Sequence, residues 1–569
     1  MVLAALVTIG VLLGPLIGQP WWSGFRAYFA NDQLSYAAIA TNVSVGGSSL
    51  VEPFTMTGTS FYPSMWYEVV GLVSRATRMP VHVSWTILGL ALVCAAVLMV
   101  GWLAYRLSGR AWAPLLPAAA LLTGTLATPT ANYWYASLNE HAVLWGPFGT
   151  LFTLNAEVAG LSLAAIAMSL LVLASWDADG PTRRTAIRVV IAAALIGLLA
   201  NVQTYSFFSG ASLAAAYLAT RALLVHRSRR RLLLTLGLLV LVLAAGPLIS
   251  RVLGPLPLFG LLLAALAPAA WPTINRHRSL SAVAVATLAI AAAPQVLHTL
   301  SGLVSDDPFL AYRQDSTQNL GVLSMATVVS SIPLALLALA CVAAVARTGQ
   351  VTLQSLVVAL VLGGALMATN DLWGFHQEPY RFWLQYAILS LLLLSAVLAW
   401  ALVSRPPQPA RAVFWIATAA LVVVWTVGLA DVRGFWDFAR QKGVIDMGAD
   451  PLVAARSLLA DKNGLVMSSR CTDPGVLKNA VHGPVAAYNK GLAWPEDVKA
   501  FEIFTDPNRR ASEDPVALRA AKVRYVITDS ACADDWSFPS TQAVVPLQKA
   551  DYLKDGQPQR LTLWWVEQA

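Results

Sequence analysis

Thirteen apolar runs of roughly the length that crosses a bilayer as a helix dominate this chain of 569 residues. With 57% hydrophobic residues, 12% charged residues and a mean hydropathy of +0.62, the chain has more apolar surface than one water-soluble core can bury. The sequence therefore predicts a polytopic α-helical membrane protein. The runs cover residues 2–18, 82–105, 111–128, 156–176, 187–202, 207–224, 232–250, 256–271, 281–297, 325–346, 353–367, 381–403 and 413–429.

Arginines in the short connections indicate how these spans are oriented. They cluster on alternate connections, which the positive-inside rule places in the cytoplasm. The other connections, and everything after about residue 430, are then expected outside the plasma membrane. This topology accounts for the net charge of +8 without a nucleic-acid partner. The clusters are Arg106 and Arg110; Arg183 and Arg184; Arg227, Arg229, Arg230 and Arg231; Arg276 and Arg278; Arg347; and Arg405 and Arg411.

Acidic residues gather on the expected outer face. Before residue 430 only Asp177 and Asp179 are expected in the cytoplasm. The positive-inside rule concerns Lys and Arg and does not require acids outside, so the asymmetry points to an extracytoplasmic working surface. The greater length of the outer loops explains part of it. The outer acids are Asp32, Glu52, Glu68, Glu140, Glu157, Asp306, Asp307, Asp315, Asp371 and Glu378.

Two parts of the chain are expected outside the bilayer, a long first loop at residues 19–80 and a tail at residues 431–569. The run at 2–18 lacks a basic n-region and a small-x-small cleavage site, so we expect a retained first span and not a signal peptide. Residues 33–42 and 63–75 of the loop are expected to be helical, and the second stretch is amphipathic. We expect a transmembrane domain at 1–430 and a small α/β domain at 431–569.

The tail differs from the rest of the chain in its amino-acid composition. It holds all the lysines, and its runs "GLVMSSR" and "VRYVITDS" predict buried strands, with "DPVALRAA" predicted as a helix before the second. Its only cysteines, Cys471 and Cys532, are expected to form a disulfide in an oxidising compartment. Cys94 and Cys341 fall in predicted spans and are expected to be core residues.

Three further outer segments combine aromatic rings, carboxylates and cations. Rings stack on sugar faces and Arg binds phosphate, so such segments suit a carbohydrate site with an anionic lipid-linked donor. The alternative is an aromatic belt with snorkelling charges at the membrane surface. The segments are "ANYWYASLNEHAVLWGPFGTLFTLNAE", "SGLVSDDPFLAYRQDSTQNL" and "NDLWGFHQEPYRF", and with the first loop they supply the candidate substrate-binding residues Tyr62, Glu140, His141, Asp306, Asp307, Trp373 and Glu378.

Motifs of soluble enzymes are absent from the sequence. It has no Gly-rich phosphate loop, paired CxxC, HExxH or GxSxG, which argues against a nucleotide-sugar enzyme of cytoplasmic type. No metal site is indicated, and the need for a divalent metal or another cofactor stays open.

The layout resembles the GT-C superfamily of integral membrane glycosyltransferases, which take sugars from polyprenyl phosphate or pyrophosphate donors. The shared features are a long first external loop with an acid in "FANDQLSY", about thirteen spans and an extracytoplasmic C-terminal domain. The resemblance implies that Asp32 is the catalytic base or a metal-linked acid, and that Arg381 in "EPYRFW" binds the donor phosphate, with His376 or Arg313 assisting. Asn31 stands where many members have a second acid, and the WWDYG signature is absent, which weakens a metal-dependent, asparagine-glycosylating interpretation.

Asp32 has two interpretations. A hydroxyl acceptor needs a base to take its proton as it attacks an anomeric carbon, and a carboxylate can supply it. Alternatively, Asp32 is the N-cap of the helix predicted over "QLSYAAIA".

Other functions remain open at this stage. A transporter or flippase for a lipid-linked saccharide predicts repeated halves and ionisable residues at mid-bilayer, and the sequence has no clear instance of either. A non-catalytic cell-wall assembly protein would share the layout. The composition is typical of a high-GC bacterium such as an actinobacterium, so we expect the acceptor to be a cell-envelope glycan such as arabinan, or an envelope lipid or protein.

Overall fold

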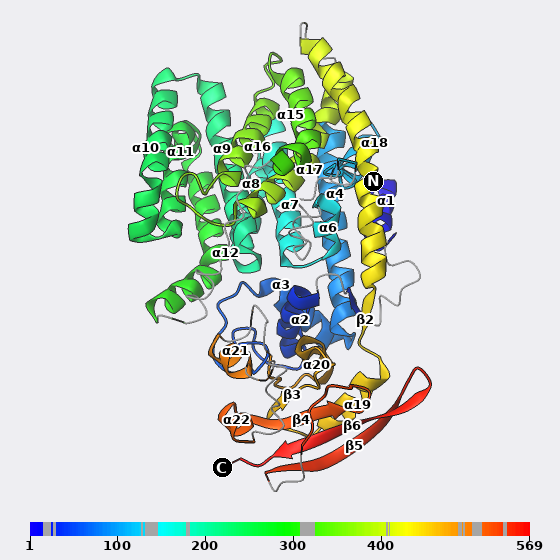
Figure 1. The fold of residues 1–569 in the computed structure, drawn as a ribbon. Coiled ribbons are helices and arrows are strands. Elements are labelled where there is room, and N and C mark those ends of the chain that lie inside the picture. Colours follow the sequence, from blue (N-terminus) through cyan, green and yellow to red (C-terminus); the bar gives the residue numbers. More distant parts are fainter. Residues whose placement is uncertain are drawn as a thin grey trace. The chain divides into compact units, whose positions relative to one another are not determined.

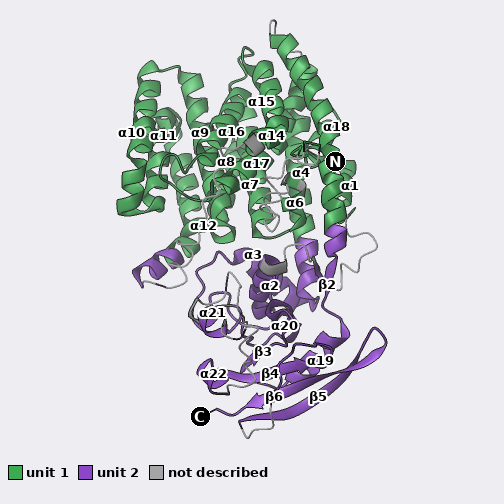
Figure 2. Ribbon diagram, in the orientation of Figure 1, with its two compact units in different colours: residues 1–15, 89–297, 315–438 green, residues 16–88, 298–314, 439–569 purple. Residues whose placement is uncertain are grey.

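The structure is a computed structural model, and it divides by internal contacts into two compact units (Figure 2). Unit 1 comprises residues 1–15, 89–297 and 315–438, and unit 2 comprises residues 16–88, 298–314 and 439–569. The first loop and the tail therefore belong to the same unit. The structure describes residues 1–14, 24–26, 30–126, 129–130, 146–177, 182–305, 307, 325–404, 408, 410–487, 492, 495–502, 504, 515–538 and 543–568.

Unit 1 consists of apolar helices (Figure 1). Within the described residues, ten helices are long and apolar enough to cross a membrane, and each coincides with a predicted run. They are α4 (Val81–Ser108), α7 (Ala156–Trp176), α8 (Arg183–Val202), α9 (Thr204–His226), α10 (Arg229–Leu253), α11 (Pro255–Arg276), α12 (Arg278–Val304), α16 (Val351–Ala368), α17 (Pro379–Ser404) and α18 (Ala410–Lys442), of which α4, α12 and α18 also carry residues of unit 2.

The remaining three predicted spans are shorter helices in the structure. Residues 2–18 give α1 (Val2–Leu13), and residues 111–128 give only α5 (Leu115–Ala120). Residues 325–346 give α14 (Met325–Ser330) and α15 (Ile332–Val345). Pro333 is the second residue of α15, where its missing N–H costs no helical hydrogen bond. Helix α6 (Gly146–Phe152) was not predicted. Within the described residues, these three runs therefore form shorter helices than hydropathy predicts.

Tight links separate the helices between α8 and α11. Gln203 alone divides α8 from α9, and its side chain accepts a hydrogen bond from Tyr205 N. Ser228 caps α10 by accepting from Arg231 N, just after Arg227 leaves the helix in a left-handed conformation. Gly254, with φ of 86°, turns the chain into α11. Only one or two residues therefore join each of these helices to the next.

Unit 2 combines helices with two sheets. A parallel pair, β3 with β4, continues through antiparallel β6 to β5, giving the order β3-β4-β6-β5. Strand β1 pairs antiparallel with β2, and a Cβ on Gly24 would clash with the Ile445 carbonyl oxygen. The elements are α2 (Ala30–Ser44), α3 (Met65–Thr77), α19 (Asp450–Leu459), α20 (Pro474–Val481), α21 (Pro495–Glu502), α22 (Pro515–Ala520), β1 (Gly24–Arg26), β2 (Val444–Asp446), β3 (Leu465–Met467), β4 (Val523–Asp529), β5 (Val544–Lys554) and β6 (Gln557–Val566).

The four-stranded sheet has a packed core on each face. Alternate residues of β4 separate cleanly, since Tyr525 and Ile527 belong to one buried cluster and Val526 to the other. The predicted strands and the helix α22 before β4 are thus present. Cys471 and Cys532 form a disulfide, with Cα atoms 5.8 Å apart.

Buried polar groups join the first loop to the tail within unit 2. Thr41 Oγ1 donates to Asn479 Oδ1 at 2.8 Å, and Asn479 Nδ2 donates to the Leu34 carbonyl at 3.0 Å. Both Glu52 and Lys478 are fully buried. Glu52 accepts from the N–H groups of Phe54 and Thr55, and Lys478 Nζ donates to the Gly483 carbonyl at 2.9 Å.

The buried pair predicts that the stability of unit 2 depends on pH. Burial raises the pKa of Glu52 from 4.5 to about 7, and this effect outweighs the hydrogen bonds and the charge of Lys478, which lower the pKa. Between these two pH values the folded state therefore keeps a proton that the unfolded state releases. Stability should therefore fall as pH rises from about 5 to 7. Burial also lowers the pKa of Lys478 to about 7, so stability should recover as pH rises further towards 10.

Glu52→Gln should remove the fall in stability between pH 5 and 7. Thermal unfolding of the purified chain at several pH values would measure this. Asp461→Asn, an exposed acid in the same unit, is the control and should keep it. Identical pH profiles for wild type and Glu52→Gln would contradict the account.

Candidate functional site

A buried ion-pair cluster surrounds Arg381 at the start of α17. Its Nη1 lies 3.8 Å from Glu157 Oε2, and its Nε contacts the Glu378 carboxylate. The side chains of Arg381, Glu157 and Glu378 are 18%, 4% and 11% exposed. Helix α7 begins beside this cluster, where Asn155 Oδ1 accepts from the N–H groups of Glu157 and Val158. Two helix starts, those of α7 and α17, thus bring charged groups to one end of unit 1.

A polar network extends from the cluster between α17 and α9. Gln385, one turn after Arg381, donates to Glu157 Oε1 at 3.1 Å, and Ser209 donates to Gln385 Oε1 at 2.9 Å. The guanidinium carbon of Arg381 lies 5.3 Å from the ring centroid of Tyr205. Spacing of three and four residues places Tyr205, Ser209 and Ser212 on one face of α9.

The charge balance of the cluster bears on the predicted role of Arg381. Two carboxylates and one guanidinium leave one negative charge when all three are ionised. Arg381 is therefore already neutralised by protein carboxylates, and a donor phosphate there would also meet their repulsion. Phosphate binding by Arg381 stays a prediction. Sequence reasoning placed Glu157 outside but did not select it, although an acid in the first turn of an apolar span is itself a signal.

The segment before α17 is held by Asn370. Its side chain donates to the carbonyls of Met367 and Gln377 and accepts from Gln377 N at 2.7 Å. Trp373 is 5% exposed, stacks on Phe375 and donates to the Leu366 carbonyl, so its observed contacts are those of a packed core residue. His376 is exposed, with φ of 50°. Sugar or phosphate contacts of Trp373 and His376 stay predictions.

Asp32 lies in the first turn of α2 and is exposed. The helix begins at Ala30, so Asp32 is inside it and not at the expected N-cap position. A carboxylate in the first turn is stabilised by the helix dipole, typically by about 0.3–1 kcal/mol. Within the described residues, the Asp32 side chain makes no capping hydrogen bond, and it is open to solvent.

Stacked tyrosines lie one helical turn from Asp32. Tyr36, four residues further along α2, has its ring centroid 5.4 Å from that of Tyr62 and 5.1 Å from that of Tyr67. The predicted residue Tyr62 is thereby brought to the same face of α2 as Asp32. Tyr36 was not predicted, although its spacing of four residues from Asp32 is the signal that could have identified it.

Asp307 also reaches the first loop within unit 2. It is 8% exposed and accepts a hydrogen bond from Thr59 Oγ1 at 2.6 Å. The other candidate residues from the same prediction, Glu140, His141, Asp306 and Arg313, lie outside the described residues. In the part of the chain that is described, no group of three or more His, Cys, Asp or Glu side chains is arranged to hold a metal ion.

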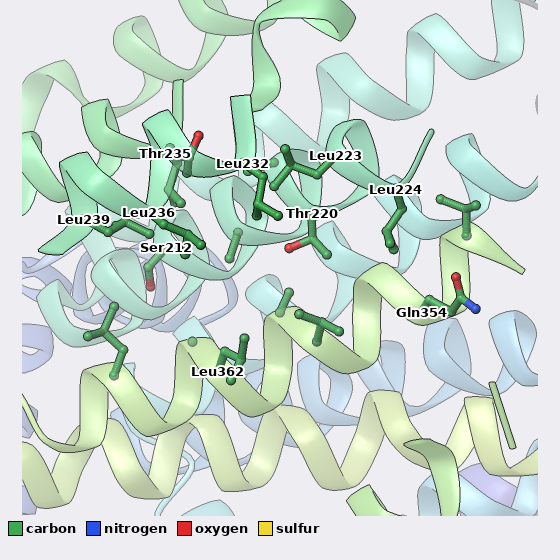
Figure 3. Close-up of a pocket in the computed structure, with 18 of the residues that line it drawn as sticks. Ser212, Thr220, Leu223, Leu224, Leu232, Thr235, Leu236, Leu239, Gln354 and Leu362 are labelled. Atoms are coloured by element: carbon green, nitrogen blue, oxygen red, sulfur yellow. The ribbon is translucent and has the colours of Figure 1, made fainter. Parts of the chain in front are cut away.

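A cavity of about 980 Å³ lies among α9, α10, α11 and α16 of unit 1. Figure 3 shows leucines of α9 and α10, including Leu223 and Leu232, on one side and Leu362 of α16 on the other. Ser212 lines the cavity and shares a hydrogen bond of 2.7 Å with Tyr386. This contact lies about one turn further along α9 than the contact between Ser209 and Gln385. The wall along α9 from Ser212 to Arg227 is about 22 Å long. This is a long, mostly apolar space beside the polar network, and three arginines, Arg227, Arg229 and Arg347, line its far end.

The fold that carries these features is similar to that of solved GT-C glycosyltransferases. Three solved structures are similar over nearly the whole chain. The archaeal oligosaccharyltransferase AglB from Archaeoglobus fulgidus, in complex with an inhibitory peptide and a dolichol-phosphate, has 13% identity and a TM-score of 0.51, covering 93% of this chain and 68% of that one. ArnT from Cupriavidus metallidurans, bound to undecaprenyl phosphate, has 11% identity and a TM-score of 0.51, covering 99% and 97%.

The third similar structure is the arabinofuranosyltransferase AftD from mycobacteria. It has 14% identity and a TM-score of 0.53, covering 99% of this chain and 39% of that one. At these identities the likeness establishes the fold. No protein-family model matches the chain, and no curated protein matches it.

The cluster predicts that removing the cation is more harmful than removing it together with its partner. Arg381→Leu leaves Glu157 and Glu378 without their cation and should destabilise the protein by about 3–5 kcal/mol, whereas Arg381→Leu with Glu157→Leu should recover part of the loss. The midpoint of thermal unfolding of purified protein measures both. Arg110→Leu at an exposed position is the control. Arg381→Leu protein as stable as wild type would contradict the ion-pair assignment.

Proposed function

We propose that this protein transfers a sugar from a polyprenyl-phosphate donor to a cell-envelope glycan, lipid or protein. The observation that carries the proposal is the fold, shared over 93–99% of the chain with AglB and ArnT, whose structures hold a dolichol-phosphate and undecaprenyl phosphate. The long apolar cavity supports it, since a prenyl chain needs such a wall. Because AftD is an arabinofuranosyltransferase, an arabinan is the acceptor to test first.

Asp32 is the proposed general base. The acceptor hydroxyl oxygen attacks the anomeric carbon, and Asp32 takes the hydroxyl proton as the new bond forms. The bond from the anomeric carbon to the phosphate oxygen breaks, and polyprenyl phosphate leaves with the electron pair. The configuration is inverted, and no covalent enzyme intermediate is needed. Tyr62 and Tyr36 supply rings near the base on which a sugar face can stack.

Arg381 is the proposed ligand of the donor phosphate, with His376 and Arg313 assisting. A guanidinium has five N–H donors, and its contacts to Glu157 and Glu378 use only part of that set. A phosphate that binds there must compete with two carboxylates. Glu157 and Glu378 therefore also hold the guanidinium in place before the donor arrives.

The tail is proposed to lie outside the cytoplasm of a plasma-membrane protein. The arginines at the ends of α4, α9 and α15 support this, as does the Cys471–Cys532 disulfide, which suits an oxidising compartment. A phosphatase reporter, active only outside the cytoplasm, should be active when fused after residue 569. Activity solely from a reporter that works in the cytoplasm would overturn this topology.

Asp32→Asn should abolish most transfer without unfolding the protein. The amide keeps the size of the side chain and costs at most the dipole stabilisation, but it cannot take the acceptor's proton. Transfer of radiolabelled sugar from a panel of polyprenyl-phosphate sugars should fall by roughly 10²-fold or more.

The matched control for this variant is Asp450→Asn. Asp450 is likewise exposed in the first turn of a helix of unit 2, so its loss changes charge and helix dipole equally. It should transfer sugar at the wild-type rate. Folded Asp32→Asn protein with near wild-type transfer would return Asp32 to a purely helical role and make Asp307 the next candidate base. A wild-type protein that transfers from none of the donors would refute the proposed reaction.

A further inference from the structure

A second cavity, of about 600 Å³, lies wholly within unit 2. The first loop contributes the C-terminal ends of α2 and α3 and the segment that leads into α4, and the tail contributes the turn after β2 together with α19 and α20. A space of this size is larger than a single inorganic ion needs and falls in the usual range of small-molecule sites.

Basic side chains line this cavity without any acidic one. They are Arg75, Arg78, His82, Arg456 and His482, and no Asp or Glu is among the described lining residues. Nearby Asp446 accepts from Gly448 N at 2.8 Å but does not line the space. Three guanidinium groups around one concave surface attract an anion and can bind it with charge-assisted hydrogen bonds.

The three arginines differ in what holds them. Arg456 Nε donates to the Ala480 carbonyl at 2.9 Å and its guanidinium contacts the Met447 carbonyl, so it is fixed across the cavity. Within the described part of the chain, the side chains of Arg75 and Arg78 have no hydrogen-bond or ion-pair partner. These two can therefore turn their donors to a ligand without breaking a protein contact.

Hydroxyl groups complete the lining. Thr41 donates to Asn479, Ser44 donates to the Thr41 carbonyl, and Ser74 donates to the Met79 carbonyl. Each hydroxyl has one proton, and here that proton is engaged by the protein. Their oxygens can consequently only accept from a ligand, which favours a molecule that carries hydroxyl donors as well as negative charge.

The cavity is separate from the proposed base. Thr41 and Ser44 lie nine and twelve residues after Asp32 on α2, which is about 14–18 Å along the helix. These two hydroxyls, which line the cavity, are therefore about two and a half to three helical turns from Asp32. The site therefore goes beyond the proposed transfer reaction and does not depend on it.

We propose that this cavity binds a phosphate ester that carries hydroxyl groups. Such a group occurs on phosphorylated envelope glycans and on the headgroup of phosphatidylglycerol. Pro80 and Val81 line the cavity where the membrane-crossing helix α4 begins, so both sources can reach it. The phosphate binds Arg75, Arg78 and Arg456, and the hydroxyls donate to Thr41, Ser44 and Ser74.

The test measures binding to the full chain, with no transfer reaction involved. Calorimetric titration in detergent with glucose 1-phosphate should give tighter binding than either glucose or inorganic phosphate, since only the ester offers both kinds of group. In parallel, native mass spectrometry from nanodiscs with equal phosphatidylglycerol and phosphatidylcholine measures which lipid is retained.

The double variant Arg75→Gln with Arg78→Gln should stay folded and should bind whichever of the two probes the cavity takes at least roughly tenfold more weakly. Lys549→Gln with Lys554→Gln removes the same charge from exposed positions of unit 2 and should leave it unchanged. If the Arg75/Arg78 variant binds glucose 1-phosphate more weakly than wild type does, the natural ligand is a phosphate on a glycan. If the variant instead retains less phosphatidylglycerol, the natural ligand is a phosphate on a lipid. Binding of neither probe, or equal binding to wild type and the Arg75/Arg78 variant, overturns the proposal.

Discussion

The geometry of unit 2 depends on the contact between the first loop and the tail, because the buried polar groups of each are satisfied by the other. Asn479 of α20 joins the side chain of Thr41 to the backbone of α2 at Leu34, and Val485 N donates to the Phe54 carbonyl at 2.9 Å. Leaving such a group buried without a partner costs about 1–3 kcal/mol. The tail thus fixes α2, and with it the face that presents Asp32 and Tyr36.

A different constraint is seen in unit 1 along α7, whose charged residues lie at its two ends. On α7, Glu157 faces Arg381 at one end, and Asp177 pairs with Arg106 and Arg188 at the other. Twenty residues separate the two acids, which is about 30 Å of helix and matches the hydrocarbon thickness of a bilayer. Between them α7 carries no charge, and its serines Ser162 and Ser169 donate to the carbonyls of Val158 and Ala165. Charge placement and membrane thickness agree along this helix.

Much of the fold could be predicted from the sequence, because hydropathy and alternation report burial directly. Ten runs became long helices, and β3 and β4 fall in the stretches predicted as strands. Residues 111–128 became a short helix, since apolarity measures burial and does not set helix length. The site was harder to predict. Arg381 and Glu378 are near in sequence, but their partner Glu157 is more than two hundred residues away, and only the packing of α7 on α17 brings it there. Tyr36 and the basic cavity likewise depend on contacts between distant segments.

A polyprenyl-phosphate lipid is proposed to bind in the cavity of unit 1. Polyprenyl phosphate with a photoreactive diazirine in its chain tests this directly, by irradiation with the purified protein and mapping of the crosslinked peptides. The account predicts crosslinks on the cavity faces of α9, α10, α11 and α16, and their loss when unlabelled polyprenyl phosphate competes. Crosslinks spread over the other apolar helices, or crosslinks that the competitor does not reduce, would contradict it.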